Sequence, residues 1–430
     1  MKIAIIGAGS SYTPELLDGV FERLQTIPVQ EIMLMDPSQE RLAINAEFAR
    51  RMAARRSAAV AIRSTQRVED AVKDAAFVIT QIRVGHMAAR IADEKLGLRH
   101  NLIGQETTGI GGFACALRTI PRILEIAHHM ERWAPNGFLI NFTNPAGIIT
   151  EAVLRHSTIR TVGLCNIPIG MIMEIVRWFG GDVADVALDY VGLNHLSWVR
   201  RVWHRGKDIT SEALAKFWEH AEQEWDDAPT RENMLVAMKS LGMFCNYYLQ
   251  YYYSTETVLQ KLKAKPKTRG EEVVEIEERL FAKYKDPSVT EKPEELGKRG
   301  GAHYSTAAFH LMDGIFNNRR NRQIVCCRNN GAVPMLDNDA SVEVSAWIDA
   351  TGAHAIPQSA PEPAIRGLMQ LIKAYESLTV EAAVSGDREK AFQALLLHPL
   401  LPPSATQCRA LLDEVLEINR PYLSGTFFKS

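Results

Sequence analysis

KIAIIGAGSSYTP, residues 2–14, decides how the chain begins to fold. The apolar run IAII predicts a buried strand, and Gly7 and Gly9 suit a tight turn directly after it. Such a turn brings backbone N–H groups to the N-terminus of the next helix, where they can bind a pyrophosphate. Pro14 suits the first turn of that helix. The stretch therefore predicts the start of a dinucleotide-binding α/β sheet.

The glycine pattern is incomplete, because Tyr12 stands where the dinucleotide fingerprint has its third glycine. A simple connection between strand and helix therefore remains an alternative. Asp36, at the end of the next predicted strand, can accept hydrogen bonds from ribose hydroxyls and repel a 2′-phosphate, which favours NAD over NADP. Ser10 and Ser11, within the turn, are further candidates for cofactor binding.

Short apolar runs alternate with helical patterns over the first 200 residues, as in a parallel sheet with crossover helices. The predicted strands cover residues 2–7, 31–36, 75–80, 137–142, 159–165 and 186–193. We expect an α/β fold with a Rossmann-like, doubly wound, mostly parallel sheet.

After Trp198 the pattern changes to longer helices and irregular segments. Apolar residues at helical spacing predict helices over 273–284 and 365–375, and the charged stretch 261–301 predicts exposed surface around one helix. We expect a Rossmann-like NAD-binding domain over 1–196, followed by a mixed α+β, largely helical substrate and catalytic domain over 197–430.

Composition narrows the class of protein. The 430 residues are 46% hydrophobic and carry a formal net charge of −2, so bulk charge predicts neither a nucleic-acid nor a membrane partner. No apolar stretch approaches the roughly 18 residues needed to cross a bilayer. The chain lacks a cationic leader, and its six cysteines form no CxxC pair, so we expect a cytoplasmic protein without a disulfide framework.

Polar clusters follow four of the predicted strands. They are QIRVG (81–85), TNPAG (143–147), Cys165 with Asn166, and Asn194 with His195. If these strands are parallel neighbours, all four clusters lie at the carboxyl edge of the sheet, where open α/β sheets bind ligands. The sequence then predicts one site, and Arg83 of the first cluster joins the cofactor-binding candidates.

Cys165 and His195 are the candidate metal ligands. A thiolate and an imidazole bind transition metals well, and two protein ligands leave coordination positions for substrate oxygens. Each residue alone also fits a structural interpretation, as a buried cysteine or a hydrogen-bonded histidine.

Three further features keep two interpretations each. Glu106, in GQETTGIGG (104–112), can polarise a neighbouring base or cap a turn. Arg83 and Arg90 can bind an anionic group or serve as ordinary surface arginines. The run NYYLQYYY (246–253) suits a packed core or interface, or an activated tyrosine beside a cation.

The combination of GAGSSYTPEL, QIRVG, GQETTGIGG, NFTNPAG, LCNIPIG, GLNH, YYLQYY and KRGGAHYS resembles the NAD- and metal-dependent glycoside hydrolases of family four, most closely their 6-phospho-β-glucosidase branch. The motifs occur in order from residue 2 to beyond 330. The resemblance implies oxidation of the sugar at carbon 3 by NAD⁺, proton abstraction at carbon 2, elimination of the aglycone, water addition and re-reduction. The glycine turn would then serve a hydrolase that regenerates NAD in each turnover.

The resemblance also assigns site residues. It implies that Cys165 and His195 bind the metal ion, usually Mn²⁺, and that Tyr248 is the base at carbon 2. It implies that Glu106 raises the basicity of that tyrosine. It further implies substrate contacts at Arg90, Asn144 and Arg269, with Arg299 as a further phosphate contact.

Asn166 departs from the 6-phospho-α-glucosidase branch, which has an acid at this catalytic position. A side-chain amide cannot donate a proton as an acid does, which favours the β-branch. A 6-phospho-α-glucosidase, a uronic-acid glycosidase, a net sugar dehydrogenase and a catalytically silent NAD-binding regulator are the alternatives. The resemblance implies a phosphosugar substrate and a homodimer or homotetramer.

Overall fold

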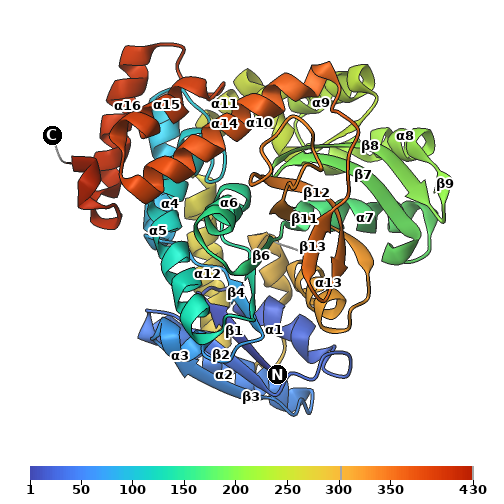
Figure 1. Ribbon diagram of the computed structural model, residues 1–430, viewed down its shortest axis with the longest axis vertical. Helices are drawn as coiled ribbons and strands as arrows, with labels where there is room; N and C mark the ends of the chain where they lie inside the picture. Colours follow the sequence, from blue (N-terminus) through green and yellow to red (C-terminus); the bar gives the residue numbers. More distant parts are fainter. Residues whose placement is uncertain (301–302, 429–430) are drawn as a thin grey trace.

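The computed structural model describes residues 1–300 and 303–428, which form two sheets with helices packed around them (Figure 1). The larger sheet has nine strands in the order β13-β12-β11-β6-β5-β4-β1-β2-β3. These strands are β1 (Lys2–Ile6), β2 (Glu31–Met35), β3 (Ala61–Thr65), β4 (Phe77–Thr80), β5 (Phe138–Asn141), β6 (Arg160–Gly163), β11 (Asn321–Arg328), β12 (Ser341–Asp349) and β13 (Gly352–Ala355).

The first six strands are parallel and lie in the order 3-2-1-4-5-6, the order of a Rossmann sheet. The four residues of β4 and the four of β5 are all buried, as expected for strands covered on both faces. This confirms the Rossmann-like expectation. The carboxyl ends of β1, β4, β5 and β6 meet at one edge of the sheet.

The expectation that residues 186–193 form another parallel neighbour of this sheet is wrong. They form β7 (Val186–Leu193) in a second sheet of order β10-β8-β7, with β8 (Leu196–His204), β10 (Phe244–Cys245) and the short β9 (Lys207–Asp208) beside β8. A parallel pairing needs a long crossover, whereas Asn194 and His195 form a two-residue turn into antiparallel β8. His195 adopts φ +65° in this turn.

Strands β3, β11, β12 and β13 were not expected from the sequence. Strand β3 is an exposed edge strand without an apolar face. Strand β12 carries Glu343 and Ser345 at buried positions, so its apolar pattern is broken. Strands β11 to β13 are antiparallel additions to the parallel sheet, and β12 also packs on β7, where Ser345 donates to the carbonyl of Leu188 at 2.8 Å.

The helices cover the sheets and fill the rest of the molecule. They are α1 (Thr13–Phe21), α2 (Gln39–Arg55), α3 (Val68–Val72), α4 (His86–Arg99), α5 (Gly109–Trp133), α6 (Ala146–His156), α7 (Asn166–Phe179), α8 (Thr210–His220), α9 (Ala228–Leu241), α10 (Gln250–Tyr253), α11 (Thr255–Ala264), α12 (Arg269–Lys285), α13 (Tyr304–Phe316), α14 (Pro363–Ser385), α15 (Arg388–Leu397) and α16 (Ala405–Asn419). Short 3₁₀ helices are η1 (Val183–Asp185), η2 (Ala221–Gln223), η3 (Tyr247–Leu249), η4 (Glu294–Arg299), η5 (Arg420–Tyr422) and η6 (Gly425–Phe428). The helices expected over 273–284 and 365–375 lie within α12 and α14. Within residues 1–300 and 303–428, no helix combines the length and apolar character needed to cross a membrane.

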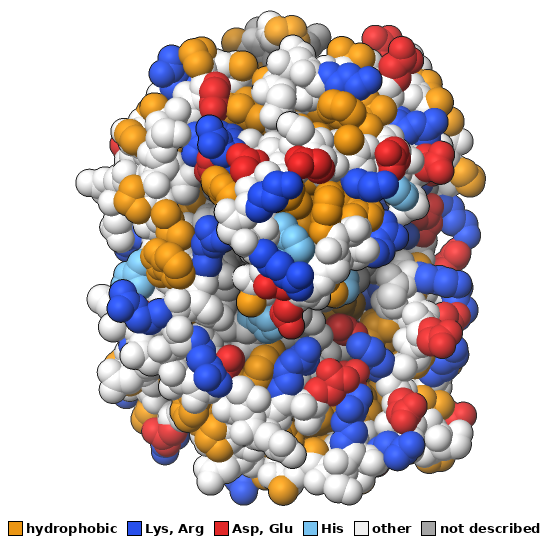
Figure 2. All heavy atoms as spheres, turned by 90° about the vertical axis from the view of Figure 1, so that its right-hand side faces the viewer, with side chains coloured by type: hydrophobic (Ala, Val, Ile, Leu, Met, Phe, Trp, Pro, Cys, Tyr) orange, Lys and Arg blue, Asp and Glu red, His pale blue; other side chains and the backbone are white. Residues whose placement is uncertain are grey.

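One continuous hydrophobic core joins both halves of the chain, from Ile3 to Phe427. The division expected after residue 196 falls at the start of β8, inside the β7–β8 hairpin, and β11 to β13 extend the first sheet from beyond it. On the face shown in Figure 2, basic and acidic side chains are interspersed, in keeping with the net charge of −2.

Candidate active site

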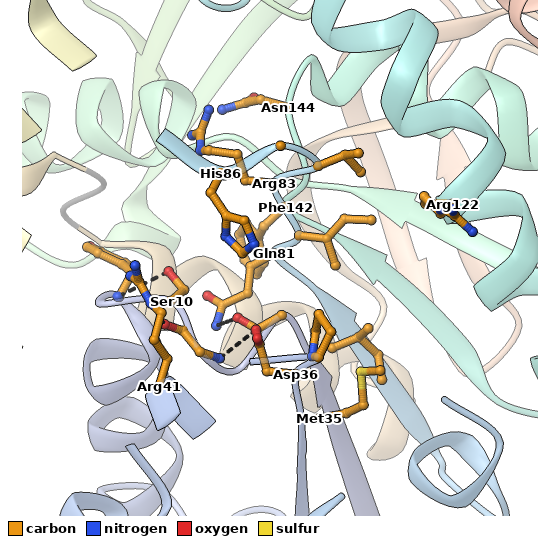
Figure 3. A pocket seen from close by; sticks show the side chains of 18 of the residues that line it. Ser10, Met35, Asp36, Arg41, Gln81, Arg83, His86, Arg122, Phe142 and Asn144 are labelled. Atoms are coloured by element: carbon orange, nitrogen blue, oxygen red, sulfur yellow. Dashed lines mark hydrogen bonds between the residues drawn. The ribbon is translucent and has the colours of Figure 1, made fainter. Parts of the chain in front are cut away.

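A cavity of about 530 Å³ opens at the glycine turn after β1. Gly7, Gly9, Ser10 and Asp36 line it (Figure 3). The carboxylate of Asp36 accepts a hydrogen bond from the Gly9 N–H at 2.8 Å and another from the Ser38 N–H at 2.9 Å. The acidic side chain at the end of β2 is therefore fixed beside the turn.

Both glycines of the turn are sterically required. Gly7 has φ +88°, and an added Cβ would lie 2.8 Å from the carbonyl oxygen of Gln81. A Cβ on Gly9 would lie 2.6 Å from the Asp36 Cγ. Bare backbone at the N-terminus of α1, with an acidic acceptor beside it, fits the phosphate and ribose of a dinucleotide. Tyr12, in place of the third glycine, packs edge-on against Tyr304, with ring centroids 5.6 Å apart.

Ser11 points away from the turn toward α12. Its hydroxyl donates to Glu277 at 2.8 Å and accepts from Arg299 Nε at 2.8 Å. Arg41 donates to the second Glu277 oxygen at 3.0 Å. Burial disfavours the charged carboxylate, but Arg299 and Arg41 outweigh it and lower the pKa of Glu277. Arg41, Glu277 and Arg299 all line the cavity. Of these, Arg41 and Glu277 are site residues that the sequence interpretation missed.

Cys165 and His195 meet at the buried end of β6 and the β7–β8 turn. Cys165 Sγ and His195 Nε2 are 3.6 Å apart. A zinc ion bonded to sulfur at about 2.3 Å and to nitrogen at about 2.1 Å, with a tetrahedral angle, would separate the two atoms by about 3.6 Å. The pair therefore fits a divalent ion. In the part of the chain that the structure describes, no group of three or more His, Cys, Asp or Glu residues could hold a metal ion.

A neighbouring threonine sets the tautomer of His195. The Thr107 hydroxyl donates its only proton to Gln105 Oε1 at 2.9 Å, so it can only accept from His195 Nδ1, 3.0 Å away. The proton of the neutral ring then lies on Nδ1, and the Nε2 lone pair faces Cys165. Burial lowers the pKa of His195 to about 3, which keeps the imidazole neutral and able to bind a metal. No sequence motif pointed to Thr107 as a site residue.

Cys165 is the N-cap residue of α7, and its side chain forms no capping hydrogen bond with the helix. Burial and the nearby Glu343 carboxylate raise the pKa of Cys165 to about 12. A divalent ion would reverse this balance, because metal ligation deprotonates a thiol. Asn166, the first residue of α7, directly follows Cys165 in the chain.

Tyr248 lies on η3 with its ring stacked on His195, the centroids being 3.6 Å apart. The Tyr248 N–H donates to the Asn246 side chain at 3.0 Å, which fixes the start of η3. Burial, followed by the Cys165 and Glu106 charges, raises the pKa of Tyr248 well above its ordinary value. The phenol therefore retains its proton unless a positive charge lies close to it.

Glu106 lies between two arginines. One carboxylate oxygen pairs with Arg83, and the other lies 3.1 Å from Arg90 Nη1. Burial opposes ionisation, but the two guanidiniums outweigh it and lower the pKa of Glu106 to about 2. Arg90 also donates to the buried Glu94 at 2.8 Å. Glu106 is consequently an anion at neutral pH.

The remaining expected residues divide into two groups. Asn144 lines the cavity with Arg83, and the two lie close together in Figure 3. Arg269, the first residue of α12, lies on the surface instead, pairing with Glu272 at 3.1 Å and donating to the Lys298 carbonyl at 2.9 Å. The structure therefore does not bring Arg269 to the cavity wall. Residues 301–302 of the KRGGAHYS motif lie outside the described residues.

Residues 106 and 107 connect the cavity to the proposed metal ligands. Glu106 pairs with Arg83 of the cavity wall, while Thr107 hydrogen-bonds His195. Strand ends β1, β4 and β5 supply the cavity, and β6 and the β7–β8 turn supply Cys165 and His195. One edge of the sheet thus brings together a dinucleotide cradle, two metal-ligating side chains, a tyrosine and an anchored carboxylate.

Comparison with known proteins agrees with this arrangement. The chain matches the models "Family 4 glycosyl hydrolase" over residues 2–180 and "Family 4 glycosyl hydrolase C-terminal domain" over residues 190–401. It is 40% identical over 441 residues to a probable 6-phospho-beta-glucosidase of Bacillus subtilis (strain 168), covering 100% of this chain and 98% of that protein. It is 30% identical over 438 residues to a 6-phospho-alpha-glucosidase of Leptotrichia buccalis, covering 98% of each.

A solved structure has the same fold over nearly its whole length. The 6-phospho-beta glucosidase from Thermotoga maritima, solved with manganese, NAD+ and glucose-6-phosphate, aligns with a TM-score of 0.91 at 36% identity and covers 99% of both chains. The chain described here belongs to family 4 of the glycosyl hydrolases.

Proposed function

We propose that the chain hydrolyses 6-phospho-β-glucosides. Its cofactors are NAD, which is regenerated in each turnover, and a divalent metal ion, Mn²⁺ by preference. The observation that carries this is the link through Glu106 and Thr107, which joins the dinucleotide cavity to Cys165 and His195. A simple dehydrogenase would need only the dinucleotide cavity. The names of the relatives, and the manganese, NAD and glucose-6-phosphate in the Thermotoga maritima structure, support the same combination.

When bound, NAD would accept and return a hydride, and the divalent ion would act as a Lewis acid on the sugar oxygens. The glycine turn and Asp36 would hold the nucleotide. Cys165 Sγ and His195 Nε2 would hold the ion, with the His195 tautomer fixed by Thr107.

Tyr248 Oη is the proposed acceptor of the carbon-2 proton. Its ring is fixed by the stack on His195, so the hydroxyl keeps one position relative to the metal ligands. Removal of a proton next to an oxidised carbon requires a base held in place, which a rigid stacked ring provides. Ionisation of Tyr248 requires a positive charge near its ring, because burial raises its pKa.

Glu106 is excluded as the leaving-group acid, because its pKa of about 2 leaves it without a proton at neutral pH. We assign it the role of anchoring Arg83 and Arg90 as donors for the substrate or cofactor. Asn166, beside Cys165, likewise cannot act as an acid. The absence of an acid at this position, together with the greater identity to a β- than to the α-glucosidase, supports the β-glucoside assignment.

Arg90, Asn144 and Arg299 are the proposed substrate contacts. Arg269 is a proposed substrate residue whose guanidinium, in the structure described here, supports the segment that carries Arg299. We further propose that residues 1–196 bind NAD and that residues 197–430 supply the base. A homodimer or homotetramer, implied by the family resemblance, is tested by light scattering.

The test is aglycone release from paired α- and β-nitrophenyl glucosides, each with and without a 6-phosphate. The protein is supplied with NAD⁺ and Mn²⁺ under reducing conditions, which protect Cys165 from oxidation. We expect release from the 6-phospho-β-glucoside with no net growth of NADH absorbance. Preference for the α-compound or for unphosphorylated sugar would overturn the substrate assignment, and stoichiometric NADH would indicate a dehydrogenase.

A further inference from the structure

Glu343 is a buried carboxylate behind the proposed metal ligands, contributed by the second half of the chain. It lies on β12 with 1% of its surface exposed. In the sheet register, Glu343 pairs with Cys326 of β11, and Cys326 pairs with Gly163 at the end of β6. The strand that ends just before Cys165 is therefore two strands away from Glu343.

Both oxygens of Glu343 accept hydrogen bonds from neutral donors. Asn194 Nδ2 donates to Oε1 at 2.9 Å, and the Tyr190 hydroxyl donates to Oε2 at 2.8 Å. Weaker contacts come from Ser197 at 3.5 Å and the Cys326 thiol at 3.7 Å. No ion pair within 4.0 Å joins Glu343 to a Lys, Arg or His of the described chain. Burying a carboxylate without a cationic partner costs free energy, so its presence here calls for a role.

Asn194 connects this carboxylate to the metal ligands. Its amide has two N–H donors, of which one binds Glu343 Oε1. Asn194 is also the neighbour of His195 in the β7–β8 turn. One side-chain amide thus connects Glu343 to the turn that carries His195, whose Nε2 lies 3.6 Å from Cys165 Sγ.

We propose that Glu343 is a positioning residue, which holds the Asn194 amide, keeps the neighbouring His195 in its turn beside Cys165, and thereby sets the affinity of this pair for a divalent cation. The inference rests on the proposed function only for its metal site. Partners that orient metal ligands from behind typically change affinity about 10- to 100-fold when removed. The role depends on an acceptor at Oε1, which a glutamine retains and a leucine lacks.

The experiment measures Mn²⁺ binding to the purified full chain by calorimetry, without NAD or sugar. Thiolate-to-Co²⁺ charge-transfer absorbance of the Co²⁺-loaded protein gives a second readout. We expect Glu343→Leu to weaken Mn²⁺ binding about 10- to 100-fold and to reduce the charge-transfer band. We expect Glu343→Gln to stay within about threefold of the parent, because its Oε1 still accepts from Asn194.

Tyr190→Phe is the matched control, since it removes a donor from the other oxygen of the same carboxylate and leaves the Asn194 bond in place. It is expected to lower stability and to change Mn²⁺ affinity by less than about threefold. If Glu343→Leu fails to fold, Asn194→Ala removes the connection while Glu343 keeps its other donors, and the same loss of affinity is expected.

Parent-like Mn²⁺ affinity in a folded Glu343→Leu or Asn194→Ala protein would overturn the proposal. Equal losses in Glu343→Gln and Glu343→Leu would also overturn it, since charge rather than the acceptor would then act. Failure of the parent chain to bind Mn²⁺ or Co²⁺ would also overturn it, because the proposal requires that Cys165 and His195 bind a divalent cation. A chain that binds the metal as expected but cleaves no phosphoglucoside would refute the proposed function and leave this inference standing.

Discussion

The imidazole of His195 lies flat against the phenol ring of Tyr248, with their centroids 3.6 Å apart and their planes 4° apart. One stack therefore carries a proposed metal ligand and the proposed base. The two rings pack through their flat faces. The proposed metal binding depends on Nε2 of His195, and the proposed proton abstraction depends on Oη of Tyr248. Removing one polar atom should leave the stack intact, so the two roles can be tested separately.

Tyr248→Phe keeps the stacked ring and removes only Oη. We expect aglycone release to fall by about 10²- to 10⁴-fold, the usual contribution of a positioned general base. Mn²⁺ affinity and far-ultraviolet circular dichroism should be unchanged. The measurement is the steady-state rate of nitrophenol release, accompanied by metal calorimetry.

The matched control for that change is Tyr252→Phe, in the same aromatic run but packed against His398. It should retain activity within a few fold. Full activity in Tyr248→Phe would remove the tyrosine from the mechanism. A loss of Mn²⁺ affinity equal to the loss of activity would show that the hydroxyl serves the metal site instead.

Thr107→Val removes the acceptor that fixes the proton of His195 on Nδ1. Either ring nitrogen can then carry the proton, and a proton on Nε2 occupies the lone pair that would bind the metal. We therefore expect Mn²⁺ affinity to fall about tenfold. Thr107→Ser retains a hydroxyl and should bind Mn²⁺ as the parent does. Calorimetric titration of both variants decides the matter, and parent-like binding by the valine variant would contradict the tautomer argument.

The sequence alone was sufficient for five of the six parallel strands, all but the exposed edge strand β3, because apolar runs mark buried strands directly. It also proposed Cys165 and His195 as a pair, which the structure brings to within 3.6 Å, although the parallel strand expected before His195 was wrong. The strand before His195 is antiparallel and belongs to another sheet, yet β12 packs on β7 and brings the turn to the same edge. The juxtaposition with Cys165 followed from a place at a strand end, and the wrong topology from assuming a crossover.

The supporting residues could not be predicted in the same way. Ser11 meets Glu277 across 266 positions, and Asn194 meets Glu343 across 149. No local periodicity encodes a contact between elements so far apart in sequence. Glu343 even obscured its own strand, since a buried charge interrupts the apolar pattern by which strands are recognised.

Glu106→Gln tests the ion pairs that Glu106 forms with Arg83 and Arg90. The pKa of Glu106 is depressed from an ordinary 4.5 to about 2, so its stabilisation is fully present above pH 4.5 and is lost as the pH falls toward 2. At pH 7 we expect the variant to be less stable by about 3 kcal/mol, because Arg83 loses its carboxylate partner and the buried Arg90 keeps only Glu94. The difference should shrink at pH 3, as measured by urea unfolding at both pH values.

Glu219→Gln, at an exposed pair with Lys216, provides the comparison and should change stability by well under about 1 kcal/mol. A stability difference between Glu106→Gln and the parent that is the same at pH 7 and pH 3 would show that the carboxylate is not ionised in the folded protein. The assignment of Glu106 as the anchor of Arg83 and Arg90 would then fail.

Gly9→Ala tests the nucleotide cradle. The new methyl group would lie 2.6 Å from the Asp36 Cγ, so the carboxylate must move away and lose its bond from the Gly9 N–H. We expect the Kd for NAD⁺, measured by calorimetry, to rise about tenfold, the equivalent of one hydrogen bond. Gly367→Ala, on the exposed side of α14 with nothing within 4 Å of the added Cβ, should bind NAD⁺ normally and gain up to about 1 kcal/mol of stability. Unchanged NAD⁺ affinity in Gly9→Ala would mean that the nucleotide does not use this turn, and the cavity at the sheet edge would need another ligand.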